Sequence, residues 1–256
     1  MLEATLANIR IVLVEPAGAL NVGSIARVMK NMGLCQLVLV NPHCDYLGDE
    51  ARQMAVHAQD VLEAAKVVRT LPEGLTQCQG AIATTARTRT LPAPLEHPRV
   101  ALPWLVDIAR QSEAALIFGP EDRGLNNAEL NYAQRFLSIP SNPAYPSLNL
   151  AQATAICCYE LYQLVESKDP SLPEGSDFTP ATPATFEALE AYYQQLETLL
   201  LKVGYLYPHT ADSRMKKFRR LFSRALPSTT EVAMLRGILS QVEWALQHSS
   251  KFLGED

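Results

Sequence analysis

Short apolar runs alternate with stretches of helical periodicity along the first 165 residues of the chain. The runs are rich in Val, Ile and Leu without polar alternation, which is typical of strands covered on both faces of a sheet. Strands that alternate with helices predict a mostly parallel α/β sheet. The expected strands are Ile9–Val14, Leu37–Val40, Lys66–Arg69, Ala81–Thr85, Leu116–Phe118 and Phe136–Ile139, and the expected helices are 22–32, 50–64, 101–111 and 126–133.

The pattern changes beyond this region. Residues 148–165 are apolar almost all round, which predicts a helix buried on more than one side, in a core or a subunit interface. Residues 166–184 contain four prolines and few large apolar side chains, a composition typical of a linker. Helical periodicity then returns at about 183–203, 212–225 and 230–247. We therefore expect a domain over 1–165, a Pro-rich linker over 166–184 and a small all-α extension over 185–256.

Composition narrows the class of protein. With 48% hydrophobic and 19% charged residues, the chain resembles an ordinary globular protein. No run approaches the roughly 18 apolar residues that a membrane span needs, and the first residues do not resemble a secretory signal. The five cysteines form no CxxC pair, so neither a zinc site nor a disulfide framework is indicated. We expect a soluble, cytoplasmic protein with no membrane partner and no metal.

Basic residues concentrate in one segment of an otherwise acidic chain. The net charge is −5, yet residues 202–224 carry seven basic side chains and one acidic one. Apolar residues at helical spacing, Met215, Phe218 and Phe222, are expected to pack inward and leave the cations on the other faces. Such a helix could be a solvated surface, but its excess of charge favours contacts with RNA phosphates. The cations are Arg214, Lys216, Lys217, Arg219, Arg220 and Arg224.

Unusual loops follow several of the predicted strands. Residues 21–27, NVGSIAR, open a helix with a glycine turn; alone, they could be a helix start with a surface arginine. Residues 118–125, FGPEDRGL, place three charged residues between two glycines and could equally form a solvated turn. In open α/β sheets, ligands bind beyond the carboxyl ends of the strands, so these loops can converge on one site.

Two further loops share this position after a strand. In residues 139–150, IPSNPAYPSLNL, three prolines stiffen the loop, and Ser147 or Asn149 can cap the helix that follows. Residues 84–89, TTARTR, combine small hydroxyl side chains, which let a ligand approach closely, with two arginines that can hold phosphate. Both loops also have a purely structural explanation: the first could only cap the helix, and the arginines of the second could be ordinary solvent-exposed charges.

In combination and in this order, NxGSxAR, FGxExxGL and IPxNPxxxSLNLAxA resemble the motifs of the SPOUT superfamily of RNA methyltransferases. The helical extension after a Pro-rich linker resembles the members that methylate a cytidine or uridine ribose 2′-hydroxyl at position 32, the first nucleotide of the tRNA anticodon loop. The resemblance implies an α/β fold with a deep trefoil knot in its C-terminal part, an exception to the rule of unknotted chains. It also implies S-adenosyl-L-methionine as cofactor, tRNA as partner, and a homodimer whose active sites form between subunits.

The resemblance further assigns roles to residues of this chain. Arg27 would be the catalytic arginine, with Asn21, Glu121, Ser147 and Asn149 beside it. The cofactor would contact Thr84, Thr85, Ala86, Gly119, Ile139, Pro146, Ser147 and Leu148. RNA would contact Arg87, Arg89 and Arg123, together with the cations of the basic segment.

The chemistry leaves the role of Arg27 open. A ribose hydroxyl must lose its proton to attack a methyl group, and Arg27 could accept that proton or remain cationic and stabilise the developing oxyanion. The cost of deprotonating a guanidinium favours the second role. Two other functions remain as alternatives: an rRNA 2′-O-methyltransferase of the same superfamily, and a non-catalytic knotted RNA-binding protein.

Overall fold

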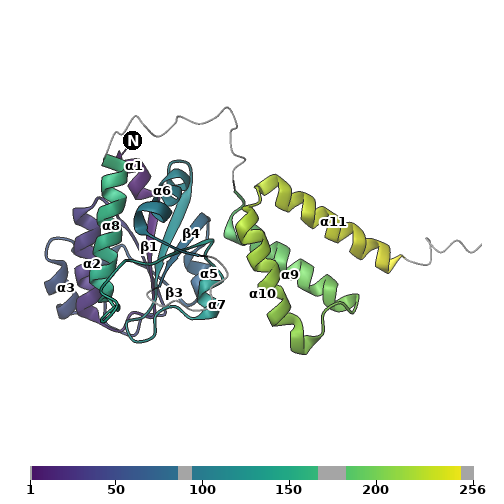
Figure 1. Ribbon diagram of the computed structural model, residues 1–256, viewed down its shortest axis with the longest axis horizontal. Helices are drawn as coiled ribbons and strands as arrows, with labels where there is room; N and C mark the ends of the chain where they lie inside the picture. Colours follow the sequence, from purple (N-terminus) through teal and green to yellow (C-terminus); the bar gives the residue numbers. More distant parts are fainter. Residues whose placement is uncertain (1, 86–93, 167–182, 249–256) are drawn as a thin grey trace, which may run out of the picture. The chain divides into compact units, whose positions relative to one another are not determined.

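The structure is a computed structural model that describes residues 2–85, 94–166 and 183–248. The chain divides into two compact units, Met1–Glu174 and Gly175–Asp256. The expected linker lies almost entirely outside the described residues. The first unit holds a β-sheet with its helices, and the described part of the second holds three helices (Figure 1).

The first unit is built on a seven-stranded sheet in the order β3-β2-β1-β6-β4-β7-β5. Every strand pairing described is parallel, which confirms the predicted α/β class. The interior strand β1, third in this order, is buried along its whole length, as expected for a largely apolar run covered on both faces. The strands are β1 (Ile9–Val14), β2 (Gln36–Val40), β3 (Lys66–Val68), β4 (Cys78–Thr84), β5 (Leu95–Glu96), β6 (Glu113–Phe118) and β7 (Arg135–Leu137).

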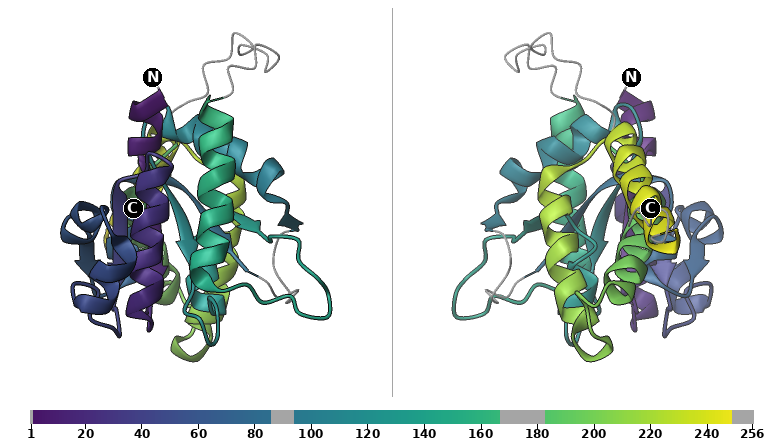
Figure 2. Two further views of the ribbon diagram at one scale, coloured as in Figure 1. Left: turned by 90° about the vertical axis from the view of Figure 1, so that its left-hand side faces the viewer. Right: turned by 90° about the vertical axis from the view of Figure 1, so that its right-hand side faces the viewer.

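Three of the longer helices of this unit pack together over the sheet. Helix α8 contacts both α2 and α6, and Figure 2 shows α2 and α8 side by side in front of the strands. In α8, Cys157, Cys158 and Leu161 are buried in the main core, whereas Ile156 and Tyr159 are exposed. Burial on more than one side, expected from the apolar pattern, is therefore not seen within this chain, and a subunit interface stays a prediction. The helices are α1 (Leu2–Ala7), α2 (Ala19–Asn31), α3 (Asp49–Ala55), α4 (Gln59–Glu63), α5 (Leu71–Gly74), α6 (Pro98–Ala109), α7 (Asn127–Leu130) and α8 (Leu150–Glu166).

The expected single helix over 50–64 is wrong, because the structure divides it into α3 and α4. Val56 has a φ of 54°, in the left-handed region, and turns the chain between them. Buried apolar residues continue on both sides of the break, at Ala55, Ala58 and Val61, so the periodicity could not reveal it. The hydrophobic pattern also did not predict the short elements α1, α5 and β5, because each has too few residues to show a periodicity.

The second unit contains the three helices that its periodicity predicts. They are α9 (Phe186–Lys202), α10 (Pro208–Ala225) and α11 (Thr229–Gln247). Their shared core includes Leu196, Met215 and Val232. The rings of Tyr192 and Phe222 meet edge to face, with centroids 5.0 Å apart, and so join α9 to α10.

Candidate functional site

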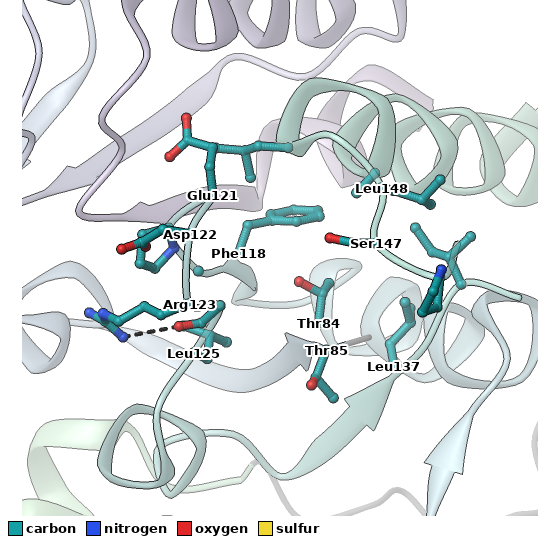
Figure 3. Close-up of a pocket in the computed structure, with 17 residues that line it drawn as sticks. Thr84, Thr85, Phe118, Glu121, Asp122, Arg123, Leu125, Leu137, Ser147 and Leu148 are labelled. Carbon is teal, nitrogen blue, oxygen red and sulfur yellow. Dashed lines mark hydrogen bonds between the residues drawn. The ribbon is translucent and has the colours of Figure 1, made fainter. Parts of the chain in front are cut away.

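A pocket lies beyond the carboxyl ends of β4, β6 and β7, where neighbouring parallel strands deliver their loops to one edge of the sheet (Figure 3). Seven of the eight residues expected to contact the cofactor line it, and the eighth, Ala86, lies outside the described residues. The pocket is lined by Thr84, Thr85, Phe118, Gly119, Pro120, Glu121, Asp122, Arg123, Gly124, Leu125, Leu137, Ile139, Pro146, Ser147, Leu148, Leu150 and Ala153.

The lining combines apolar walls with a few polar groups. Leu137, Ile139 and Leu148 provide apolar surface, and the hydroxyl groups of Thr84 and Ser147 face the pocket (Figure 3). The Thr84 hydroxyl donates a hydrogen bond to the carbonyl of Ile117 at 3.0 Å, which fixes its orientation. Such a mixture suits a small organic ligand with both apolar and hydrogen-bonding parts.

Gly119 has a packing role in the loop after β6. A Cβ atom at this position would lie 2.3 Å from the backbone nitrogen of Leu125, far inside van der Waals contact. The glycine therefore lets the loop fold back on itself and bring Leu125 against its first residue. Besides the cofactor contact that the resemblance assigns to it, Gly119 thus meets a packing requirement within the loop.

Arg123 holds the same loop to two other parts of the chain. Its Nη2 donates to Glu15 Oε2 at 2.6 Å, and its guanidinium forms two hydrogen bonds of 3.0 Å with the Glu129 carboxylate. The hydrogen bond from Arg123 is the main reason why the pKa of Glu15 is lowered from its ordinary value. Arg123 thus positions the loop, and the RNA contact expected of it stays a prediction.

Three of the predicted catalytic residues form a hydrogen-bonded chain at the rim of the pocket. Asn21 Nδ2 donates to Glu121 Oε1 at 2.8 Å, and Asn149 Nδ2 donates to Asn21 Oδ1 at 3.0 Å. The Glu121 carboxylate also accepts from the backbone N–H groups of Ala17 and Gly18. The chain connects the start of α2, the loop after β6 and the start of α8.

Asn149 has a second task in this arrangement. Its Oδ1 accepts from the backbone N–H of Ala151 at 2.8 Å and of Gln152 at 3.3 Å, so the side chain caps α8. The expected cap is therefore present in Asn149. Because Oδ1 accepts the capping hydrogen bonds, the Nδ2 group of Asn149 is oriented to donate to Asn21.

Arg27 stands apart from this cluster. It lies on α2, six residues beyond Asn21, with an exposed side chain, and it does not line the pocket of its own chain. Six residues are about one and two-thirds helical turns, so Arg27 and Asn21 leave α2 on different sides. Within the described residues, no hydrogen bond or ion pair engages its guanidinium.

The basic segment forms most of α10, and its cations have different surroundings. Arg219 makes two hydrogen bonds with Glu190 and lies 4.5 Å from the ring centroid of Tyr193. Lys216 pairs with Asp212 one turn earlier, and Arg214 donates to the carbonyl of Tyr205. Lys217, Arg220 and Arg224 have no such partner in the described part of the chain. Arg87 and Arg89 lie outside it.

Sequence reasoning missed part of the pocket wall. Phe118 and Leu137 are the last residues of β6 and β7, and Leu150 and Ala153 belong to the first turn of α8. Their position at a strand end or helix start is a usable signal. Asp122, in the charged loop, was not singled out either.

The described residues show neither a metal-binding cluster nor a membrane-spanning helix. They contain no group of three or more His, Cys, Asp or Glu side chains arranged to hold a metal ion. No helix among them combines the length and the apolar character needed to cross a membrane.

Comparison with known proteins relates both units to methyltransferases. The model of the SpoU rRNA methylase family matches residues 8–159, and the model of the C-terminal domain of tRNA methyltransferase TrmJ matches residues 187–251. The tRNA (cytidine/uridine-2′-O-)-methyltransferase TrmJ of Cronobacter sakazakii is 41% identical, over 93% of this chain and 97% of its own length. The tRNA (cytidine/uridine/adenosine-2′-O-)-methyltransferase TrmJ of Pseudomonas aeruginosa is 40% identical, over 92% and 94%.

Solved structures extend the similarity to the fold. The crystal structure of TrmJ from Z. mobilis ZM4 matches with a TM-score of 0.78 and 33% identity, over 91% of this chain and 98% of that one. A probable methylase family protein from Haemophilus influenzae Rd KW20 matches with a TM-score of 0.61 and 33% identity, over 95% and 99%.

Proposed function

The chain belongs to the SpoU rRNA methylase family, and we propose that it is a tRNA 2′-O-methyltransferase that modifies cytidine and uridine. The observation that carries this proposal is the 41% identity to a TrmJ enzyme over 93% of the chain, which includes both units. The relatives named for cytidine and uridine modification support those two substrates. Position 32, at the start of the anticodon loop, is the expected target within the tRNA.

The pocket fits S-adenosyl-L-methionine. Apolar walls such as Leu137 and Leu148 suit the flat adenine ring, and the hydroxyls and exposed backbone groups of the loops suit the ribose and the amino acid part. Thr84, Thr85, Gly119, Ile139, Pro146, Ser147 and Leu148 would provide these contacts. When bound, the cofactor supplies an activated methyl group for an in-line displacement.

The residues at the rim of the pocket would orient the acceptor ribose. Glu121 is held by Asn21 and two backbone donors, so it acts by positioning Asn21. Ser147 lines the pocket just before α8, and Asn149, the cap of α8, donates to Asn21. A rigid cluster of this kind raises the rate by keeping the ribose oxygen in line with the methyl group.

Arg27 would act on the substrate oxygen from another direction. Because it does not line its own pocket, it fits the expected homodimer, in which each active site forms between subunits. Its exposed guanidinium, with no partner in the described residues, is free to bind phosphate and to stabilise the oxyanion. The role of proton acceptor would instead require a guanidinium to lose a proton, at a high cost in free energy.

The proposal includes a trefoil knot in the first unit and a tRNA-binding role for the all-α second unit. The loop after β7 and the start of α8 share the pocket with the loop after β6, as expected where a trefoil knot holds the cofactor. The three helices α9, α10 and α11 would form the tRNA-binding domain, and the enzyme would act in the cytoplasm. The C-terminal match to a tRNA methyltransferase domain favours tRNA over rRNA as substrate.

Two measurements test the proposal. Calorimetry with S-adenosyl-L-methionine should show binding by the wild-type protein, which a non-catalytic RNA-binding protein lacking a cofactor site would not show. Incubation with unmodified tRNA, followed by mass mapping of nuclease fragments, should locate one added methyl group on the ribose of nucleotide 32. Methylation of rRNA fragments with none on tRNA would contradict the proposal.

A further inference from the structure

The six cations of α10 divide into two groups by their contacts within the second unit. Arg214, Lys216 and Arg219 are engaged with the carbonyl of Tyr205, with Asp212 and with Glu190. The guanidinium of Arg219 also lies over the ring of Tyr193, in the core between α9 and α10. Removing Arg219 would disturb the packing between α9 and α10, whereas Lys216 belongs to an exposed pair with Asp212 that contributes little to stability.

The second group, Lys217, Arg220 and Arg224, forms one stripe along the helix. A helix turns through about 100° per residue, so these three positions lie within about 60° of one another. Met215 and Phe222 point to the opposite side, where they pack in the core of the unit. The stripe extends for about 10 Å along the helix axis.

The charges of the stripe are not balanced within the described residues. The other cations in this part of the second unit have partners, since Lys202 lies 3.8 Å from Glu243 and Arg236 donates to Gln195. Lys217 and Arg224 are exposed, whereas Arg220 is half-buried and its covered Nε atom has no hydrogen-bond partner. A half-buried guanidinium without an anion is unfavourable, and a bound phosphate would relieve this cost.

We propose that Lys217, Arg220 and Arg224 form the phosphate-binding stripe of the second unit, and that Arg214, Lys216 and Arg219 are occupied by contacts within the unit. The ligand is the sugar-phosphate backbone of RNA, contacted without regard to base sequence. This inference rests on the proposed tRNA substrate. Of the six cations of α10 that were expected to contact RNA, three therefore remain for that contact.

The test is the salt dependence of tRNA binding by the full-length protein. Each phosphate contact contributes about 0.7 to 0.9 to the slope of log K against log salt. The triple variant Lys217→Gln, Arg220→Gln, Arg224→Gln should therefore lose two to three from that slope. Between 50 and 200 mM salt, its loss of affinity should be roughly 20- to 40-fold smaller than that of wild type.

Lys216→Gln is the matched control, since it removes one cation from the same helix. Its slope should equal that of wild type, whereas Lys217→Gln alone should lower the slope by about 0.7 to 0.9. Equal slopes for Lys217→Gln and Lys216→Gln, or an unchanged slope in the triple variant, would overturn the proposal. Thermal unfolding checks the fold: Arg219→Gln should lower the melting temperature and the triple variant should not.

The outcome can be separated from failure of the proposed function. The triple variant should bind S-adenosyl-L-methionine as wild type does, and should methylate tRNA with a raised KM but a nearly unchanged kcat. If wild type methylates no tRNA, the proposed function fails, although the salt dependence still reports on the stripe. If methylation is normal and the slopes do not differ as expected, the stripe alone is wrong.

Discussion

Asn149 Nδ2 donates a 3.0 Å hydrogen bond to Asn21 Oδ1, across 128 residues of sequence. This bond connects the start of α2 with the cap of α8, and Asn21 in turn donates to Glu121 in the loop after β6. It makes the orientation of Asn21 depend on a residue whose most evident sequence feature is helix capping. The two tasks of Asn149 can be separated, because one uses its oxygen and the other its nitrogen.

Asn149→Asp should separate them. A carboxylate can still cap α8, so the free energy of unfolding should change by less than about 0.5 kcal/mol, whereas Asn149→Ala should lose about 1 kcal/mol. Both variants lose the donor to Asn21, and the misplaced ribose should reduce single-turnover methyl transfer about 100-fold. Wild-type activity in a folded Asn149→Asp protein would show that this hydrogen bond does not position the substrate.

Gly119→Ala should damage the cofactor pocket more than a change in the same loop at Gly124. The new Cβ at residue 119 would lie 2.3 Å from the nitrogen of Leu125, so the loop must move. We expect the affinity for S-adenosyl-L-methionine to fall at least about tenfold, the result of losing one or two good contacts. Calorimetry on the purified variant measures it.

Gly124→Ala provides the control, because open space surrounds that position. Its φ of 64° makes alanine strained, at a cost of about 1 kcal/mol in stability, but no atom is displaced. If both variants bind the cofactor equally well, close packing at Gly119 is not what shapes the pocket.

Lowering the pH should weaken the pair between Glu15 and Arg123 and so destabilise the loop after β6. The pKa of Glu15 is lowered by the hydrogen bond from Arg123, so the ionised form stabilises the folded state. This contribution is complete above the ordinary value of 4.5 and is lost as pH falls through the lowered pKa. Because both side chains are about one-third exposed, it should amount to less than about 1 kcal/mol.

Urea unfolding of wild type and Glu15→Gln at several pH values measures this effect. At pH 7 the variant should be less stable than wild type, and the difference should shrink as pH falls below 4.5. A difference that stays constant over the whole range would mean that Glu15 acts through packing and not through its charge.

Arg27→Ala should abolish methyl transfer and leave the affinity for S-adenosyl-L-methionine nearly unchanged. The side chain does not line the pocket, so cofactor contacts are not lost. Arg27→Lys keeps the positive charge without the planar donor geometry, and should retain partial activity if the residue stabilises charge. Full activity of Arg27→Ala would end this assignment.

A mixed dimer tests whether Arg27 serves the other subunit. If the active sites form between subunits, co-expressed Arg27→Ala and Gly119→Ala chains should regain activity, because one of the two sites would have an intact pocket and an intact arginine. At a cofactor concentration that leaves the Gly119→Ala pocket largely empty, each parent variant alone should be much less active than the mixed dimer. A mixed dimer as inactive as both parents would place Arg27 and the pocket in the same chain.

Much of the architecture was readable from local pattern. The apolar run Ile9–Val14 is β1 to the residue, and the helices of the second unit begin and end within a few residues of their expected bounds. Side-chain period and apolar content are properties of neighbouring residues, and burial follows them directly. The pairing of Lys216 with Asp212, one turn apart, is likewise a relation that sequence spacing can predict.

Other features depended on which segments the fold brings together. The amino acid sequence shows neither that Arg123 reaches Glu15 nor that Arg219 pairs with Glu190, because strand order and helix packing decide which distant carboxylate is near. The break at Val56 was equally hidden, since the apolar period continues through it. Local periodicity thus determined the elements and the motifs they carry. Tertiary packing decided which charged groups pair with one another and which remain available to bind a substrate.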